Sequence, residues 1–262
     1  MVRRRAVLAV ALVALSPLAV RAADEEASIE FFYPLVTRRP VIERELELRF
    51  SHDKGRGGRR NEAVAAVELP ILPRWQVELE VPAVFTDPRE GPSAGGPGDI
   101  ELQNKFLLLK SVEHKALVAA GFEVKFPSGS ERRGLGGEAA VEPFLAAGIA
   151  LGDFDLLAEL AYEWNLNAHV EGEREQALGA GGAIGYRAFR RFTPLVEVTT
   201  LSQTRGGERD ARSLRGKTQV YVVPGFNVRP LPGTTARFGV QLPLTDARKS
   251  DYTLHGGLVW EF

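Results

Sequence analysis

Apolar and polar residues alternate along most of the chain after residue 40, and the alternation is clearest in the last eleven residues. Every second side chain there is apolar, aromatic or glycine: Tyr252, Leu254, Gly256, Leu258, Trp260 and Phe262. The residues between them are mixed and mostly small or polar. A period of two indicates a β-strand with one apolar face and one wetter face. When tilted, a strand of this length also suffices to cross the hydrocarbon layer of a bilayer.

The same alternation recurs along the chain, so the pattern predicts twelve strands. The other segments lie at 42–50, 63–69, 75–85, 100–108, 116–126, 141–149, 154–164, 177–188, 192–201, 220–228 and 236–242. The expected connections alternate in length. Long polar ones fall near 51–60, 86–98, 127–136, 167–176, 202–216 and 244–251, and short ones near 70–73, 110–114, 152–153, 188–191 and 229–234.

Long loops at one end and short turns at the other are typical of outer-membrane β-barrels. Aromatic residues also fall near both expected ends, as in the girdles of such barrels. We therefore expect an all-β fold, a transmembrane antiparallel up-and-down β-barrel of twelve strands over residues 41–262. The alternative is a soluble sheet that happens to finish on Phe262.

The two ends of the sequence resemble targeting signals, one for export and one for insertion into the outer membrane. Arg3, Arg4 and Arg5 precede an apolar run and a small-residue cleavage site, so residues 1–22 are expected to be a secretory signal peptide. Residues 23–40 are expected to be a periplasmic lead-in. The final strand resembles the insertion signal of bacterial outer-membrane barrels, which implies the barrel-insertion machinery as a partner; its residues are Tyr252, Leu254, Leu258, Trp260 and Phe262. The expected location is the outer membrane of a Gram-negative cell, with both termini periplasmic.

Composition narrows the possible chemistry. The chain has no Cys, so it offers no disulfide and no thiolate metal site. Without the leader, 29 Lys and Arg stand against 34 Asp and Glu, and this mild acidity argues against a nucleic-acid partner. The histidines have no metal-ligand spacing and no Ser lies in a nucleophile motif; they are His52, His114, His169 and His255. We expect no cofactor, no metal and no enzymatic activity.

Several short phrases are shared with one known family. They are 69–75 (LPILPRW), 98–102 (GDIEL), Lys105-Phe106, 126–130 (FPSGS) and 224–228 (PGFNV). They resemble the bacterial outer-membrane proteins named for the meta-pathway of phenol degradation, whose members are also called transporters. Ser128 stands where that family favours Thr. The resemblance implies a barrel that transports small compounds, hydrophobic or aromatic ones among them, and it carries no catalytic residues.

Charged residues at alternate strand positions are expected to face the lumen, because lipid does not tolerate them. The predicted lumen-lining residues are Glu43, Glu45, Glu47, Glu78, Glu80, Glu101, Lys105, Glu123, Lys125, Glu142, Glu159, Glu163, Arg187 and Arg237. Arg74 and Lys115 are expected among the inward bases. Small residues such as Gly181, Gly185 and Gly148 form a thin wall, and the cluster Phe31-Phe32-Tyr33 is expected to pack against it.

The predicted function follows from the predicted lumen. We expect a passive channel or transporter for small molecules, in contact with outer-membrane lipid and lipopolysaccharide. Acids outnumber bases at the inward positions, which predicts a preference for cations. The alternative is a closed barrel with a structural or binding role and no transport.

Overall fold

The computed structural model describes residues 29–167, 175–187, 189, 191–205 and 214–262, and most of them form strands. The strands are β1 (Glu45–Gly55), β2 (Gly58–Leu72), β3 (Trp75–Pro88), β4 (Ala94–Pro97), β5 (Ile100–Ser111), β6 (Ala116–Phe126), β7 (Ala140–Leu151), β8 (Phe154–Asn165), β9 (Gln176–Tyr186), β10 (Phe192–Arg205), β11 (Thr218–Leu231), β12 (Thr234–Pro243) and β13 (Ser250–Glu261). One 3₁₀ turn, η1, spans Glu131–Arg133. No helix in these ranges is long and apolar enough to cross a membrane.

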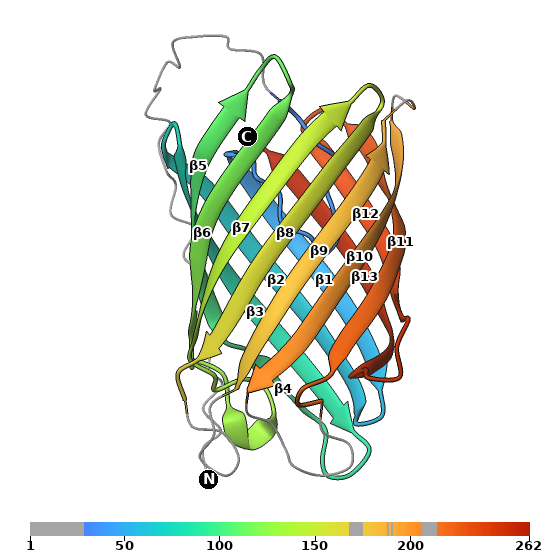
Figure 1. Ribbon diagram of the computed structural model, residues 1–262. Coiled ribbons are helices and arrows are strands. Elements are labelled where there is room, and N and C mark those ends of the chain that lie inside the picture. Colours follow the sequence, from blue (N-terminus) through green and yellow to red (C-terminus); the bar gives the residue numbers. More distant parts are fainter. Residues whose placement is uncertain (1–28, 168–174, 188, 190, 206–213) are drawn as a thin grey trace.

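Twelve of the strands close into a ring. Successive strands pair antiparallel, and β13 pairs with β1 from Glu45↔Glu261 to Gly55↔Ser250, which joins the two ends of the sheet. The short strand β4 pairs only with β3, at Ala83–Thr86, and extends the barrel wall beyond the end of β5 along the same edge of β3. Figure 1 shows the tilted strands enclosing a single interior. The twelve-stranded antiparallel barrel expected from the sequence is confirmed.

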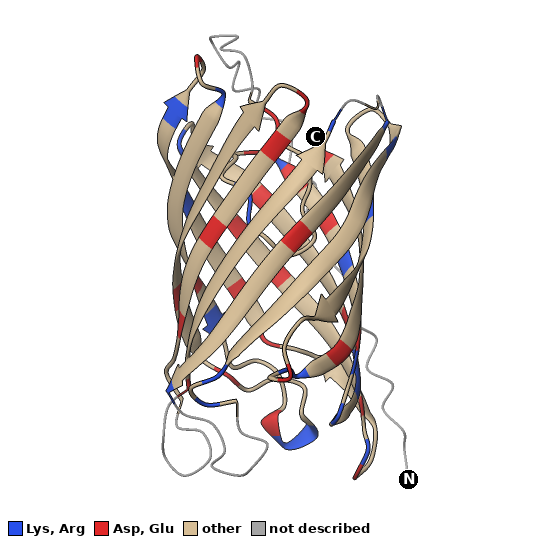
Figure 2. Ribbon diagram, turned by 45° about the vertical axis from the view of Figure 1, so that its right-hand side comes forward, with Lys and Arg blue, Asp and Glu red and all other residues tan. Residues whose placement is uncertain are grey.

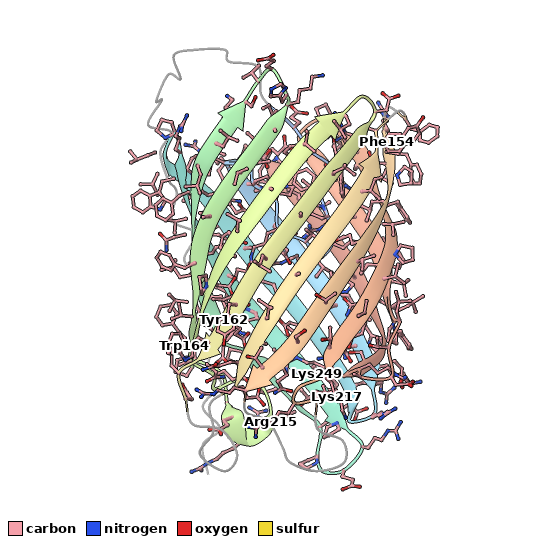
Figure 3. The ribbon with its side chains drawn as sticks, in the orientation of Figure 1. Phe154, Tyr162, Trp164, Arg215, Lys217 and Lys249 are labelled. Carbon is pink, nitrogen blue, oxygen red and sulfur yellow. The ribbon has the colours of Figure 1, made fainter. Side chains whose placement is uncertain are left out.

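The outer wall of the barrel is apolar. On β1, Leu48 and Phe50 are each half-exposed and point outward, whereas Glu45 and Glu47, at the alternate positions, are buried inside. The same parity holds on β13, where Leu258 and Trp260 are exposed and Val259 is buried. Figure 3 shows side chains covering the outside of the ribbon, with Phe154 near one end and Trp164 toward the other. Alternation along each strand therefore separates an apolar exterior from a polar interior.

The two ends of the barrel differ, as Figure 1 shows. The end with the connections 73–74, 112–115, 152–153, 187–191 and 232–233 is called the short-turn end here, and the opposite end the long-loop end. Gly152 and Gly233 occupy tight turns with φ of +63° and +65°, a backbone conformation that suits glycine. The elements β4 and η1 both lie at the long-loop end.

Three local expectations were wrong. A long loop was expected at 51–60, but the β1–β2 ladder continues to Gly55↔Gly58 and leaves only a two-residue turn. Strand pairing needs only backbone groups, so the polar residues there continue the sheet. The first strand was expected from residue 42, but it begins at Glu45. Arg74 and Lys115 lie exposed in short turns, not at inward strand positions.

Residues 29–44, called the inner segment below, precede β1 and fold into the barrel interior. Phe31, Phe32 and Tyr33 are almost fully buried. They join an apolar cluster with wall residues that include Leu117, Leu157, Ala183 and Leu195. The barrel therefore holds its own chain in its interior.

Candidate functional site

Two aromatic rings of the inner segment pack against glycines of the barrel wall. A Cβ on Gly148 would lie 2.7 Å from the ring of Phe31, and a Cβ on Gly185 would lie 2.6 Å from Cγ of Phe32. Real Cβ atoms do not approach this closely, so glycine at both positions makes room for the two rings. Ala146, which is fully buried, extends the same thin wall.

Carboxylates of the wall hold the backbone of the inner segment. Glu197 on β10 accepts hydrogen bonds from the N–H groups of Leu35 at 2.5 Å, Val36 at 3.2 Å and Thr37 at 2.8 Å. A buried backbone without a strand partner must find acceptors elsewhere, and Glu197 supplies them. Asp155 does the same for the N–H of Phe32 at 3.0 Å.

Arg38 is the most highly connected side chain of the inner segment. Its guanidinium donates to Glu123 at 3.0 Å, Glu142 at 2.6 Å and Gln103 at 3.0 Å. Its backbone N–H donates to Glu159 at 2.8 Å, and its guanidinium carbon lies 4.7 Å from the ring centre of Phe144. These contacts join the inner segment to β5, β6, β7 and β8.

Arg38 also neutralises a repulsive pair. Glu123 and Glu142 are direct cross-strand neighbours on β6 and β7, and like charges in this position destabilise a sheet. Burial alone would lower the pKa of Arg38, but the neighbouring carboxylates outweigh it and hold the pKa above its ordinary value. The guanidinium is therefore permanently charged where the wall concentrates negative charge.

Tyr33 and Arg39 hold the inner segment at the short-turn end. The Tyr33 hydroxyl donates to Glu45 at 3.0 Å and to Glu261 at 2.6 Å, which links it to both strands of the closing seam. Arg39 lies over the Tyr33 ring at 3.6 Å and pairs with Glu43 and Glu45. Tyr33 and Arg39 therefore both lie at the end of the barrel where β1 starts.

Other predicted lumen residues form ion pairs between strands, three of the four named next across one intervening strand. Lys105 lies 3.4 Å from Glu68, Lys125 lies 3.1 Å from Glu101, Arg49 pairs with Glu80, and Arg237 pairs with Glu47. Glu78 accepts from Gln103 at 2.5 Å. Glu163 is half-buried near the long-loop end of β8, and Arg187 follows β9 and pairs with Asp155 at 2.7 Å. Figure 2 shows acidic positions recurring along the strands.

A polar cavity of about 340 Å³ remains between the inner segment and the wall of β1, β2, β3, β5, β6, β8 and β12. Eight glutamates line it, against five bases: Arg38, Arg39, Arg49, Lys105 and Arg237. Two of the five bases come from the inner segment. Sequence reasoning missed both, because it counted charges only on strands; the adjacent pair Arg38-Arg39 after an aromatic cluster was the available signal.

The histidines and acids give no clear metal site in the described part of the chain. His52 contacts Asn61 at 2.7 Å and His255 contacts Gln241 at 3.3 Å, while His169 lies outside the described residues. Glu45, Glu47 and Glu68 approach one another within 4.8 Å, but Arg39, Arg237 and Lys105 already pair with them. Their geometry is that of an ion-pair network.

Comparison with known proteins shows the fold. No protein-family model matches the chain, and no curated protein sequence matches it. An outer membrane channel from Pseudomonas putida F1 is similar in structure, with a TM-score of 0.67 and 12% identity over 89% of this chain and 100% of that one. The NanC porin has a TM-score of 0.61 with 15% identity, over 83% of this chain and 100% of that one. The KdgM porin has a TM-score of 0.57 with 10% identity, over 83% and 99%.

Proposed function

We propose that this protein is an outer-membrane channel for the passive passage of small molecules, with the inner segment as its constriction. The observation that carries the proposal is the acid-rich cavity of about 340 Å³ inside a barrel whose outer wall is apolar. Monomeric soluble proteins rarely expose an apolar surface this extensive, whereas a lipid-facing barrel requires one. The structurally similar proteins named above are a channel and two porins.

The proposed orientation places the short-turn end in the periplasm. Membrane barrels carry short periplasmic turns and longer external loops. Glu261 and the start of β1 lie at the short-turn end, so both ends of the barrel sequence belong on the periplasmic side. The same orientation suits residues 1–22 as a cleaved export signal, which precede the described residues.

The proposed channel prefers cations. Around the cavity the glutamates exceed the bases by three, and a low-dielectric wall focuses the resulting field. Each arginine of the inner segment offsets part of this charge, so displacing the segment would make the lumen more acidic. The family resemblance extends the proposal to hydrophobic or aromatic compounds as permeants.

A closed barrel with a structural or binding role is the second candidate. The extensive hydrogen bonding of the inner segment to Glu197, Asp155 and the partners of Arg38 favours it, because this contact set closes part of the lumen. The two candidates differ in one measurable property, which is conductance.

Planar-bilayer recording of folded protein tests the proposal. We expect small, cation-preferring conductance from the full barrel and a larger conductance after deletion of residues 24–39, because the deletion removes most of the constriction. Heat-dependent mobility on gels would show that the truncated barrel still folds. Absence of conductance in both proteins would refute the channel and favour the closed barrel.

A further inference from the structure

A second, larger cavity lies at the long-loop end. Its volume is about 590 Å³, within the range of small-molecule sites. Its lining comes from the β1–β2 hairpin, the loop after β3, the turn η1 and the loop before β13. Asp53, Arg60 and Thr86 belong to it and share the inward strand parity of Glu47, Glu68 and Glu78. The cavity therefore opens into the mouth of the barrel, not toward the lipid.

The lining of this mouth cavity is basic. Five bases stand against two acids, Asp53 and Glu90; the bases are Arg59, Arg60, Arg132, Arg133 and Lys249. Two of the five are already paired, Arg59 with Asp87 at 2.6 Å and Arg60 with Glu62 at 3.0 Å. Figure 3 shows Lys249 at this end of the barrel, where Arg215 and Lys217 also lie.

The remaining three bases carry the surplus charge. Arg133 donates to the neutral backbone carbonyl of Gly95 at 2.9 Å. No ion pair joins Arg132, Arg133 or Lys249 to a carboxylate within the ranges that the structure describes. An anion bound between them would gain charge-assisted hydrogen bonds without first displacing any carboxylate of the described residues.

A buried aspartate holds η1 in place. The carboxylate of Asp99 accepts hydrogen bonds from the N–H groups of Gly129 at 2.7 Å, Gly137 at 2.8 Å and Glu138 at 2.9 Å. Leu135, two residues after η1, is almost fully buried. The backbone of the loop that carries Arg132 and Arg133 is therefore anchored at both sides, which lowers the entropic cost of ordering the loop around a ligand.

We propose that the mouth cavity is a binding site for small oxyanions, namely carboxylate- or phosphate-bearing solutes. Arg132 and Lys249 are its anion-binding residues. Arg133 is a positioning residue, because its hydrogen bond to the carbonyl of Gly95 holds η1 against β4. This inference goes beyond the proposed channel, because it requires only a folded barrel and not an open lumen. A solute reaches the cavity from the aqueous mouth, whereas a lipid headgroup would have to leave the outer wall.

Isothermal titration of the full-length folded barrel with citrate tests the site. We expect saturable binding that weakens as salt rises. The double variant Arg132→Ala/Lys249→Ala should bind citrate about tenfold more weakly or worse, because it loses two charge-assisted contacts. The matched control is Arg56→Ala/Arg89→Ala, which removes the same charge from exposed positions at the same end but outside the cavity.

The possible outcomes separate the explanations. Loss of binding in the cavity variant alone supports the site. Equal loss in both double variants would show only a diffuse field, and absence of saturable citrate binding in the wild type would overturn the proposal. Protein in nanodiscs with and without phosphatidylglycerol provides a further arm, since competition from that anionic lipid would assign the cavity to headgroups and refute a solute site. Heat-dependent gel mobility shows that each variant is folded.

Discussion

Replacing Arg38 with alanine should release the inner segment. The guanidinium contacts Glu123, Glu142 and Gln103 within 3.0 Å, and its loss leaves two neighbouring glutamates facing each other on β6 and β7. Breaking a buried ion pair by removing one partner costs about 3–5 kcal/mol. About a quarter of the Arg38 side chain is exposed to the cavity, so the lower end, about 3 kcal/mol, applies. This shifts the balance between docked and released segment by about a hundredfold.

Single-channel recording measures this shift directly. The Arg38→Ala barrel should spend up to about a hundredfold more time in its larger conductance state than the wild type. Arg44→Ala is the matched control, because Arg44 belongs to the same segment and carries the same charge, and it does not line the cavity. If both variants open as rarely as the wild type, Arg38 does not hold the segment. If both open equally often, the effect is one of net charge alone.

Three further outcomes are expected. Gly185→Ala should destabilise docking of the segment by about 1–3 kcal/mol through overpacking against Phe32, seen as faster trypsin cleavage of the segment. Gly182→Ala on the same strand, whose Cβ would meet only one atom at 3.9 Å, should behave as wild type, and equal cleavage of the two would contradict the packing argument. In a salt gradient the reversal potential should show cation preference that fades as salt rises, and Glu78→Lys should reduce it; anion preference in the wild type would exclude an acidic filter. Deletion of Phe262 should lower the amount of folded barrel in outer-membrane fractions, and unchanged amounts would show that the terminal aromatic is no insertion signal.

The sequence by itself determined the barrel. Alternation with a period of two assigns each residue to one face, and this signal is local, so it survives without knowledge of the partner strand. Leu48 and Phe50 outside and Glu45 and Glu47 inside follow from it directly. The count of twelve barrel strands follows for the same reason, whereas the short strand β4 was not expected. The local signal was weakest at strand ends, where polar residues around Gly55 continue the ladder into the 51–60 region.

The sequence predicted that the Phe31-Phe32-Tyr33 cluster packs against the small-residue wall, and the contacts of Phe31 with Gly148 and of Phe32 with Gly185 confirm it, but only the tertiary structure decided which charges hold the inner segment. Residues 29–40 lack the alternation, and their partners lie on strands far away in the sequence, as the contacts of Arg38 with Glu142 and of Leu35 with Glu197 show. The mouth cavity likewise combines Arg132 with Lys249, which barrel closure brings to one end. A hydrophobic pattern specifies which face a residue takes, but it does not specify which charges meet across a closed lumen. Those encounters depend on register, tilt and closure, which are properties of the whole barrel.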